Sequence, residues 1–359
     1  MRYFLSDNHE GGGIAFNVKS LCNRFSDAGI PCEIMFLNVN FFDELLGIVK
    51  KDDTPVLYTT SGKSLLVALF ISILRGFMFR HTYVAPIVYH PRFADPSVSK
   101  FRSLINRSLK YLSTNLVYYC DEAKSATKIH QSDCSERIIG LSSNFEYIDA
   151  RPIVCPELDD PTFLWKVSTI GRLVDFKMGY IRSLIEFAKN HPNVLVMIGG
   201  FGPHEKEVID ESAIIQNLVY LGKLSIEESK YLVNRSDLFI GMGTTLADSV
   251  VAGTPAIVAI ESNKNGFTTG YFGNDHSICY GEYSSEKTYF DLGEFLGDIV
   301  KMKLTERPDP VEVLIQPFER LLSVEPSFEL LPLHKAIFSM FYLLAAFTSR
   351  KLFNQPDYH

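Results

Sequence analysis

Short apolar runs alternate with amphipathic stretches along most of the chain, and this pattern predicts βαβ units built around parallel sheets. In the first part, apolar residues from Ile14 to Phe25 recur on one helical face, and Gly29 and Pro31 mark the end of that helix. The strands expected around it cover residues 3–6, 33–37, 55–59, 83–89 and 116–119.

The pattern changes near residue 150. Residues 151–161 (RPIVCPELDDP) hold three prolines and three acidic residues, which is typical of a linker. A second alternating series follows, with strands expected at 167–170, 194–198, 219–221, 238–240 and 256–260 and helices at 180–189, 225–234 and 246–252. The prediction is an α/β protein with Rossmann-like domains over residues 1–150 and 162–320, followed by C-terminal helices over 321–359.

Composition narrows the function classes. A chain of 359 residues is long for one compact core, which agrees with two domains. The net charge of −7 argues against a nucleic-acid partner, and the six cysteines form no C-x-x-C pair that would indicate a zinc site. No basic-then-apolar signal segment opens the chain, so we expect a cytoplasmic protein.

Two segments are unusually apolar, residues 64–79 and residues 336–347. Both are shorter than the roughly 20 residues of a membrane span. One interpretation is a pair of buried helices, the second of which packs back on the N-terminal domain. The other is that one or both rest peripherally on an anionic membrane face, at the inner side of the plasma membrane.

Candidate chemistry gathers in the second half of the chain. Arg172 follows a predicted strand, and Lys177 comes five residues later. The carboxyl ends of parallel strands are where open α/β sheets bind ligands, and an Arg and a Lys near a helix start can compensate the charge of a diphosphate. Ordinary surface charge is the alternative interpretation.

Glycine-bearing loops follow neighbouring strands in the same region. They are GGFGP at 199–203 and GMGTT at 241–245, the latter followed by Asp248 and by AGTP at 252–255. Backbone N–H groups at such a helix start bind phosphate, and a carboxylate on the helix can bind ribose hydroxyls. A single G-x-G is a weak signal, but several such loops in one domain are more specific.

The order of these pieces resembles the donor-binding domain of family 4 glycosyltransferases of the GT-B fold. The matching segments are STIGRLVDFKMG, VLVMIGGFGP, LVYLGKLSIEESKYLVNRSDLFI and GMGTTLADSVVAGTPAIV, within residues 167–260. The resemblance implies two Rossmann-like domains facing each other across a cleft. It also implies transfer of a sugar from a nucleoside-diphosphate sugar to a glycan or lipid-linked acceptor, usually with retention at the anomeric carbon.

The resemblance also implies roles for single residues. Arg172 and Lys177 would hold the donor diphosphate and stabilise the charge on the leaving group. Asp248 would bind the ribose. The remaining donor-binding candidates are the loop residue Gly202, the base-side residues Gly222, Lys223 and Leu224, and the sugar- and phosphate-side residues Gly241, Met242, Gly243, Thr244 and Thr245. The chain has no D-x-D triplet, so neither a metal nor another cofactor is expected.

The N-terminal half offers candidates for the acceptor side. Gly11, Gly12 and Gly13 resemble the family's glycine-rich loop that meets donor phosphates and acceptor, although a flexible loop is an alternative. His90 ends a predicted strand and would hydrogen-bond the donor sugar or help deprotonate the acceptor, unless it is structural. Arg92 would steer an anionic acceptor, unless it is an ordinary solvated charge.

Some positions depart from the family pattern. Ile240 and Asp248 stand where the family has paired carboxylates, Phe201 where an acidic residue is common, and Met178 where Gly often follows the Lys. These departures leave the donor sugar and the stereochemical course open. The leading hypothesis is a glycosyltransferase of bacterial surface polysaccharide synthesis; the alternatives are a degenerate, non-catalytic glycosyltransferase-like subunit and a sugar-nucleotide epimerase.

Overall fold

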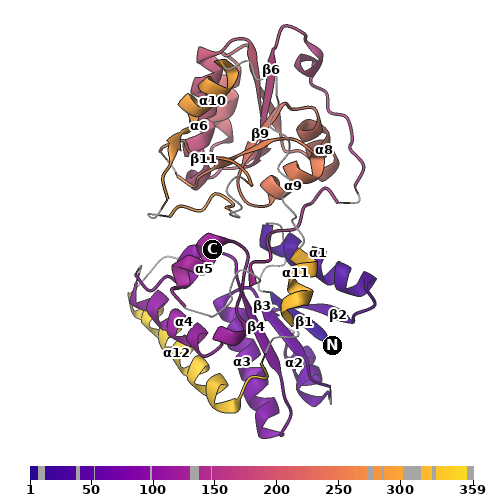
Figure 1. Cartoon of the computed structure of the whole chain (residues 1–359), viewed down its shortest axis with the longest axis vertical. Helices are drawn as coiled ribbons and strands as arrows, with labels where there is room; N and C mark the ends of the chain where they lie inside the picture. The colour runs from indigo at the N-terminus through magenta and orange to yellow at the C-terminus, as the bar shows by residue number, and fades with distance from the viewer. Residues whose placement is uncertain are drawn as a thin grey trace. The chain divides into compact units, whose positions relative to one another are not determined.

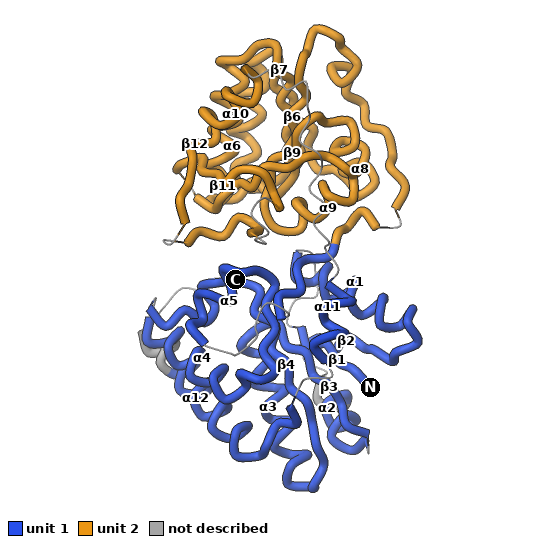
Figure 2. Tube along the Cα trace, in the orientation of Figure 1, with its two compact units in different colours: residues 1–142, 315–359 blue, residues 143–314 orange. Residues whose placement is uncertain are grey.

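The structure is a computed structural model that divides into two compact units, coloured separately in Figure 2. Unit 1 holds residues 1–142 and 315–359, and unit 2 holds residues 143–314. The residues that the structure describes are 1–6, 13–37, 41–51, 53–97, 99–129, 137–146, 148–262, 264–273, 279–284, 287–301, 317–325 and 329–353.

Unit 1 is built on a parallel five-stranded sheet with the strand order β2-β1-β3-β4-β5. Its strands are β1 (Arg2–Ser6), β2 (Cys32–Phe36), β3 (Val56–Thr59), β4 (Tyr83–Val88) and β5 (Val117–Tyr118). Its helices are α1 (Gly13–Asp27), α2 (Phe41–Lys50), α3 (Gly62–Phe77), α4 (Lys100–Lys110), α5 (Asp121–Thr127), α11 (Pro317–Val324) and α12 (Leu333–Phe353).

The last two helices return to the N-terminal part of the chain. Helix α12 packs along α3 and α4, and α11 packs on α1, where Phe318 meets the ring of Phe25 edge-on at 5.1 Å (Figure 1). Unit 1 is therefore completed by helices that follow the last strand of its sheet only after the whole of unit 2.

Unit 2 has a seven-stranded sheet in the order β12-β11-β10-β9-β6-β7-β8, parallel except where β11 pairs with β10 and β12. Its strands are β6 (Trp165–Arg172), β7 (Val194–Phe201), β8 (Leu218–Gly222), β9 (Leu238–Gly241), β10 (Ala256–Ala259), β11 (Phe267–Tyr271) and β12 (Phe290–Asp291). Its helices are α6 (Asp175–Asn190), α7 (Glu205–Ser212), α8 (Ile226–Asn234), α9 (Thr244–Ala252) and α10 (Leu292–Lys301).

The α/β class with two parallel, Rossmann-like sheets is confirmed, and local signals explain several element ends. The capping box of α8 is present, with Ser225 accepting from the Glu228 N–H and the Glu228 carboxylate accepting from the Ser225 N–H. Gly253 ends α9 in the left-handed region at φ 70°. Helix α6 begins five residues before the predicted start, so that Lys177 lies in its first turn.

The division into units falls at 142/143 and 314/315, whereas the sequence predicted boundaries at 150 and 320. Residues 151–161, predicted as a linker, pack on unit 2. Cys155 and Leu158 are buried with Leu195, Met197 and Leu232. Arg151 pairs with Glu228, with nitrogen and oxygen 2.9 Å apart. Proline-rich composition identified an irregular segment here, but it did not reveal that two of its apolar side chains are buried.

Among the described residues, no helix is both long enough and apolar enough to cross a membrane. The apolar segment at 64–79 corresponds to α3 and its end, and the segment at 336–347 lies inside α12.

Arg75 is the largest fully buried side chain of unit 1. Its guanidinium donates hydrogen bonds to carbonyl oxygens of Ile48, Lys51 and Asp53, near the end of α2, and to Thr82 at the start of β4. The last carbonyls of a helix lack intrahelical partners and carry partial negative charge, so a buried cation is stabilised there. Arg75 thereby joins α2, α3 and β4.

Replacing Arg75 by Met is expected to lower the free energy of unfolding by at least about 3 kcal/mol. The reason is that several buried carbonyl oxygens lose their donor, at about 1–3 kcal/mol each. Denaturant unfolding measures the loss, and Lys63→Met, at an exposed position of the same helix, is the matched control. Equal stability of the two variants would contradict the role given to Arg75.

Candidate active site

The predicted donor-site loops meet at one edge of the unit 2 sheet. Strands β6, β7, β8 and β9 are parallel neighbours, so their carboxyl ends lie together. Arg172 at the end of β6 is in register with Phe201 at the end of β7, and Gly199 is in register with Gly222. This edge therefore brings together Arg172, the 199–203 loop, residues 222–224 and the 241–245 corner.

Glycine is required where the β6 and β7 loops touch. A β-carbon on Gly200 would lie 1.9 Å from the carbonyl oxygen of Gly171, and one on Gly202 would lie 2.5 Å from that of Leu173. Both glycines have positive φ, 150° and 154°, a backbone conformation that residues with a side chain rarely adopt. The G-F-G turn is thus pressed directly against the backbone that carries Arg172.

Lys177 reaches back over the end of β6 from the first turn of α6. A β-carbon on Gly171 would lie 2.8 Å from the Lys177 Nζ, so the ammonium occupies the space that a side chain at Gly171 would fill. Burial, and next the nearby positive charge of Arg172, lower the pKa of Lys177 to about 8. No acidic side chain in the described part of the chain forms an ion pair with Lys177 or Arg172. The edge therefore carries two adjacent cations that favour an anion.

The corner from Gly241 to Thr245 places a helix N-terminus at the same edge. Gly243, at φ 68°, is the N-cap of α9, and its N–H donates to the Tyr280 carbonyl at 2.7 Å. The Thr245 hydroxyl donates to the Met242 carbonyl at 3.0 Å and stiffens the turn. The first N–H groups of a helix point outward and attract negative charge, so this corner adds to the positive character of the edge.

Asp248, predicted to bind ribose, is buried one turn into α9 and is held by residues at the start of unit 2. Its Oδ1 accepts hydrogen bonds from the Ser143 hydroxyl at 2.9 Å and from the Asn144 N–H at 2.5 Å. Its Oδ2 accepts one from the Asn144 side-chain amide at 2.9 Å. Burial raises the pKa of Asp248 to about 6, and these hydrogen bonds oppose the rise. Both carboxylate oxygens of Asp248 thus already accept hydrogen bonds from unit 2 itself.

Asp248 also lines a cavity of about 160 Å³ between α8, α9 and the sheet. Asn144, Ile170, Ile226 and Thr245 are among the other residues of its wall. Because a complete ligand site usually measures roughly 300–1,000 Å³, this cavity has room for one ring of a ligand rather than for the whole of it.

The residues after β8 border the same edge. Gly222 has φ 68°, and the side chain of Leu224 fills the space above Gly199, where a β-carbon would lie 2.8 Å from Leu224 Cδ1. The exposed Lys223 places its Nζ 5.0 Å from the centre of the Phe201 ring, a cation–π contact. An aromatic ring at position 201 is therefore part of the site edge.

Two departures from the family pattern have a packing explanation. Ile240 on β9 and Met178 on α6 are both fully buried in the main core of unit 2. The side chain at position 240 thus faces the core, where an unpaired carboxylate would be costly.

The acceptor-side candidates belong to unit 1. His90 caps the short 3-10 turn Pro91–Phe93, and its Nδ1 accepts a hydrogen bond from the Arg92 N–H at 3.0 Å. Gly13 begins α1, whereas Gly11 and Gly12 lie outside the described residues.

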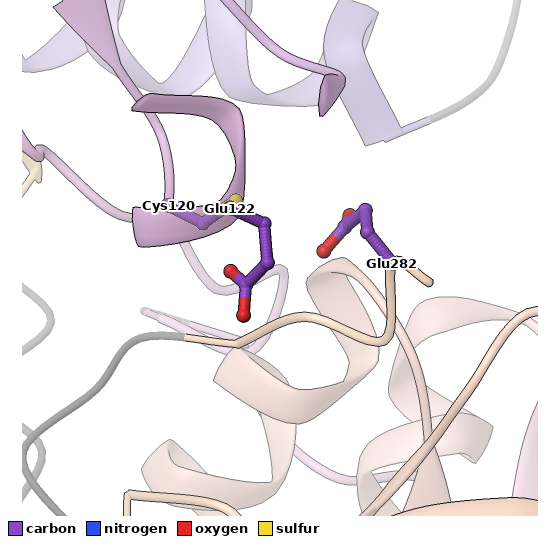
Figure 3. A group of neighbouring side chains, drawn as sticks. All are labelled: Cys120, Glu122 and Glu282. Carbon is purple, nitrogen blue, oxygen red and sulfur yellow. The ribbon is translucent and has the colours of Figure 1, made fainter. Parts of the chain in front are cut away.

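Cys120 and Glu122 lie at the start of α5, as Figure 3 shows. The sulfur of Cys120 accepts a hydrogen bond from the Ala123 N–H at 3.3 Å, so it caps this helix. Glu282, also drawn there, belongs to unit 2, and we assign no metal site to the three. The described cysteines are free thiols.

Solved structures with similar folds agree with this architecture. HepE of Anabaena, solved with UDP and glucose, superposes with a TM-score of 0.54 over 97% of this chain and 99% of its own, at 12% identity. Sucrose-phosphate synthase of Thermosynechococcus elongatus gives 0.54 over 98% and 99%, also at 12% identity. The chain has the GT-B fold.

A third GT-B structure extends the comparison. The lipopolysaccharide outer core galactosyltransferase WaaB, in its apo form, gives a TM-score of 0.52 at 12% identity, over 95% of this chain and 98% of its own. No protein-family model and no curated protein matches the sequence. At this identity the similarity establishes the GT-B fold alone, so the chemistry has to be argued from the site.

Sequence reasoning missed the partners of Asp248. Ser143 and Asn144 lie between the two αβ series, in a stretch with no motif, and no pattern linked them to a residue 100 positions later. The cation–π contact of Lys223 was also missed, although Phe201 had been singled out as unusual.

Lys177→Met is expected to raise the unfolding midpoint of the ligand-free protein by a few degrees. It is also expected to abolish the stabilisation that pyrophosphate gives to the wild type. A lysine with a pKa of about 8 in the folded state and 10.5 when unfolded costs stability while it is charged. The advantage of the variant should be full below about pH 8 and shrink as the pH rises toward 10.5. Thermal unfolding with and without pyrophosphate measures both effects. Lys206→Met, at an exposed lysine, should change neither.

Proposed function

We propose that the protein is a glycosyltransferase that moves a sugar from a nucleoside-diphosphate sugar, bound to unit 2, to an acceptor. The observation that carries the proposal is the pair of adjacent cations, Arg172 and Lys177, beside the N-terminus of α9 at one sheet edge. Within the described ranges, no acidic side chain forms an ion pair with either of them. The GT-B neighbours support it, since HepE has been solved with UDP-glucose and with UDP and glucose.

The chemistry follows from where charge grows. When the bond between the anomeric carbon and the diphosphate oxygen breaks, the electron pair stays on that oxygen and the nucleoside diphosphate leaves with one more negative charge. Arg172, Lys177 and the first N–H groups of α9 would stabilise this charge. The Gly171–Gly200 and Leu173–Gly202 contacts fix the backbone that carries Arg172 before the reaction.

The donor and acceptor are assigned by class. We propose that the nucleobase lies against residues 222–224 and Phe201, and that Asp248 accepts from a ribose hydroxyl through Oδ2, which accepts one hydrogen bond from Asn144. The acceptor would be a glycan or lipid-linked saccharide, and WaaB, a lipopolysaccharide galactosyltransferase, supports a role in bacterial surface polysaccharide synthesis. His90 would hydrogen-bond the donor sugar or help deprotonate the acceptor, and Arg92 would attract an anionic acceptor.

We further propose that transfer retains the anomeric configuration, as the family resemblance implies. We also propose that it needs no metal ion, because Arg172, Lys177 and the N-terminus of α9 supply the positive charge. NMR of the product's anomeric proton tests the first point. Activity in the presence of EDTA tests the second.

Calorimetry with a panel of nucleoside diphosphates is expected to find one base that binds without added metal. With the matching sugar nucleotide and an acceptor, Arg172→Ala should lower kcat about 10²–10³-fold, because one preorganised donor is lost from the transition state. Arg182→Ala, which removes a cation paired with Glu207 on the outside of α6, should leave kcat unchanged. Failure of every nucleotide to bind would favour the non-catalytic alternative, and turnover of the donor without an acceptor would favour an epimerase.

The affinity for the nucleoside diphosphate is expected to fall as the pH rises above about 8. Lys177 attracts the diphosphate only in its charged form, which prevails below its pKa of about 8. The phosphate itself is fully ionised above about pH 7, so it adds no pH dependence there. Titrations between about pH 7.5 and 9.5 should show the fall, which approaches tenfold per pH unit above the pKa. Lys177→Arg should bind with little change over this range, and a fall equal to that of the wild type would assign the titration to another group.

A further inference from the structure

Most of the fully buried residues of helix α12 are small, and several of its large apolar residues are exposed, which is the reverse of an ordinary surface helix. It buries Ala336, Ser339, Leu343 and Ala346 against unit 1, so three of these four inward positions hold small residues. On the opposite side it exposes four large apolar residues, which we call the α12 ridge: Ile337, Phe338, Phe341 and Leu344. Phe341 has 64% of its surface exposed. A surface helix normally places its large apolar residues toward the core, so this ridge indicates a partner that covers it.

Helix α3 continues the same feature. It buries apolar residues such as Leu65 and Leu69, as a surface helix normally does, but it also exposes Phe70 and Phe77. Its end lies beside the start of α12, because a β-carbon on Gly76 would come 3.0 Å from Leu333 Cδ1. The exposed apolar residues of α3 and the α12 ridge therefore belong to adjoining helices.

The residue after the end of α3 is the least expected part of this surface. Phe79 is 94% exposed and sits in the left-handed region at φ 55°, at a helix end where glycine is the usual choice. A bulky side chain there costs about 1 kcal/mol or more in backbone strain, and its exposure to water costs further free energy. Neither cost is offset within the described part of unit 1.

Positive charge flanks the ridge. Helix α4 exposes Lys100, Arg107 and Lys110 and contains no acidic residue. It runs alongside α12 (Figure 1), with Tyr111 stacked 5.7 Å from Phe338 near one end and Phe101 placed 6.2 Å from Phe347 near the other. The exposed acid Glu329 at the start of α12 lies 3.8 Å from the Lys335 ammonium. The helix that packs along α12 thus exposes three cations and holds no acidic residue.

We propose that this surface docks unit 1 on an anionic lipid bilayer, with the α12 ridge, Phe77 and Phe79 among the acyl chains and the α4 cations at the headgroups. Aromatic and aliphatic residues beside a row of lysine and arginine match the apolar and anionic layers of such a membrane. A second copy of this chain fits less well, because a symmetric contact would bring two rows of like charge together. The proposal goes beyond the glycosyltransferase assignment and does not depend on it.

The full chain is tested by sedimentation with phosphatidylcholine vesicles prepared with and without phosphatidylglycerol. The wild-type protein should pellet with the anionic vesicles only, and added salt should weaken the binding because it screens the α4 cations. Absence from the anionic pellet at low salt would overturn the proposal.

Three variants locate the surface. Phe341→Gln with Leu344→Gln should lower the vesicle partition coefficient at least about tenfold, since each buried apolar side chain contributes about 1.5–3 kcal/mol. Arg107→Glu with Lys110→Glu should abolish the preference for anionic lipid. Ile214→Gln, at a 79% exposed position of unit 2, is the matched control and should bind like the wild type.

Phe79→Gly separates docking from folding. It should raise or preserve the unfolding midpoint, because glycine adopts the left-handed conformation without strain, and yet weaken vesicle binding. Undiminished binding of the Phe341, Leu344 and Phe79 variants would overturn the proposal. A different result would identify a second copy of the chain as the partner of this surface. In that case the wild-type protein would not bind vesicles but would form a concentration-dependent dimer, and the Phe341 and Leu344 variant would not.

Discussion

The contact between two backbones at the ends of β6 and β7 is the constraint on which the candidate site depends. Gly200 and Gly202 rest on the carbonyl groups of Gly171 and Leu173 with no room for a β-carbon. This contact fixes the direction in which the chain leaves β6, and so it fixes where Arg172 and the start of α6 can lie. The positive edge of the sheet is a consequence of backbone packing, because no acidic side chain in the part of the chain that the structure describes pairs with its cations.

The same edge shows a conflict between stability and binding. Burial, and next repulsion by Arg172, lower the pKa of Lys177, so its charged form costs free energy in the protein without ligand. A bound anion would offset this electrostatic cost, so part of the free energy lost from folding stability would be regained as binding affinity. Arg75 in unit 1 shows the contrasting solution, in which a buried cation is stabilised by carbonyl oxygens and serves the fold alone.

Sequence patterns predicted the elements well where the signal is local. Strand periodicity, the Ser225 capping box and Gly253 all lie at the predicted places, because each depends on neighbours within a few residues. The cation pair and the glycine corners lie at one sheet edge, as parallel strands bring their carboxyl ends together, and their role in donor binding stays a prediction. The Asp248 partners and the packing of residues 151–161 on unit 2 were missed, because they depend on which distant segments meet. The segment at 336–347 shows what composition cannot predict. Its sequence shows that it is apolar, but only the structure shows which of its side chains face the core of unit 1.

Asp248 links the candidate site to the place where the chain passes from one unit to the other. It lies one turn after Thr244 on α9. Its carboxylate accepts hydrogen bonds from Ser143 and Asn144, the first residues of unit 2. One helical turn therefore connects the 241–245 corner with the segment by which the polypeptide enters unit 2. A substitution that removes the Asp248 carboxylate would break this connection at both Ser143 and Asn144.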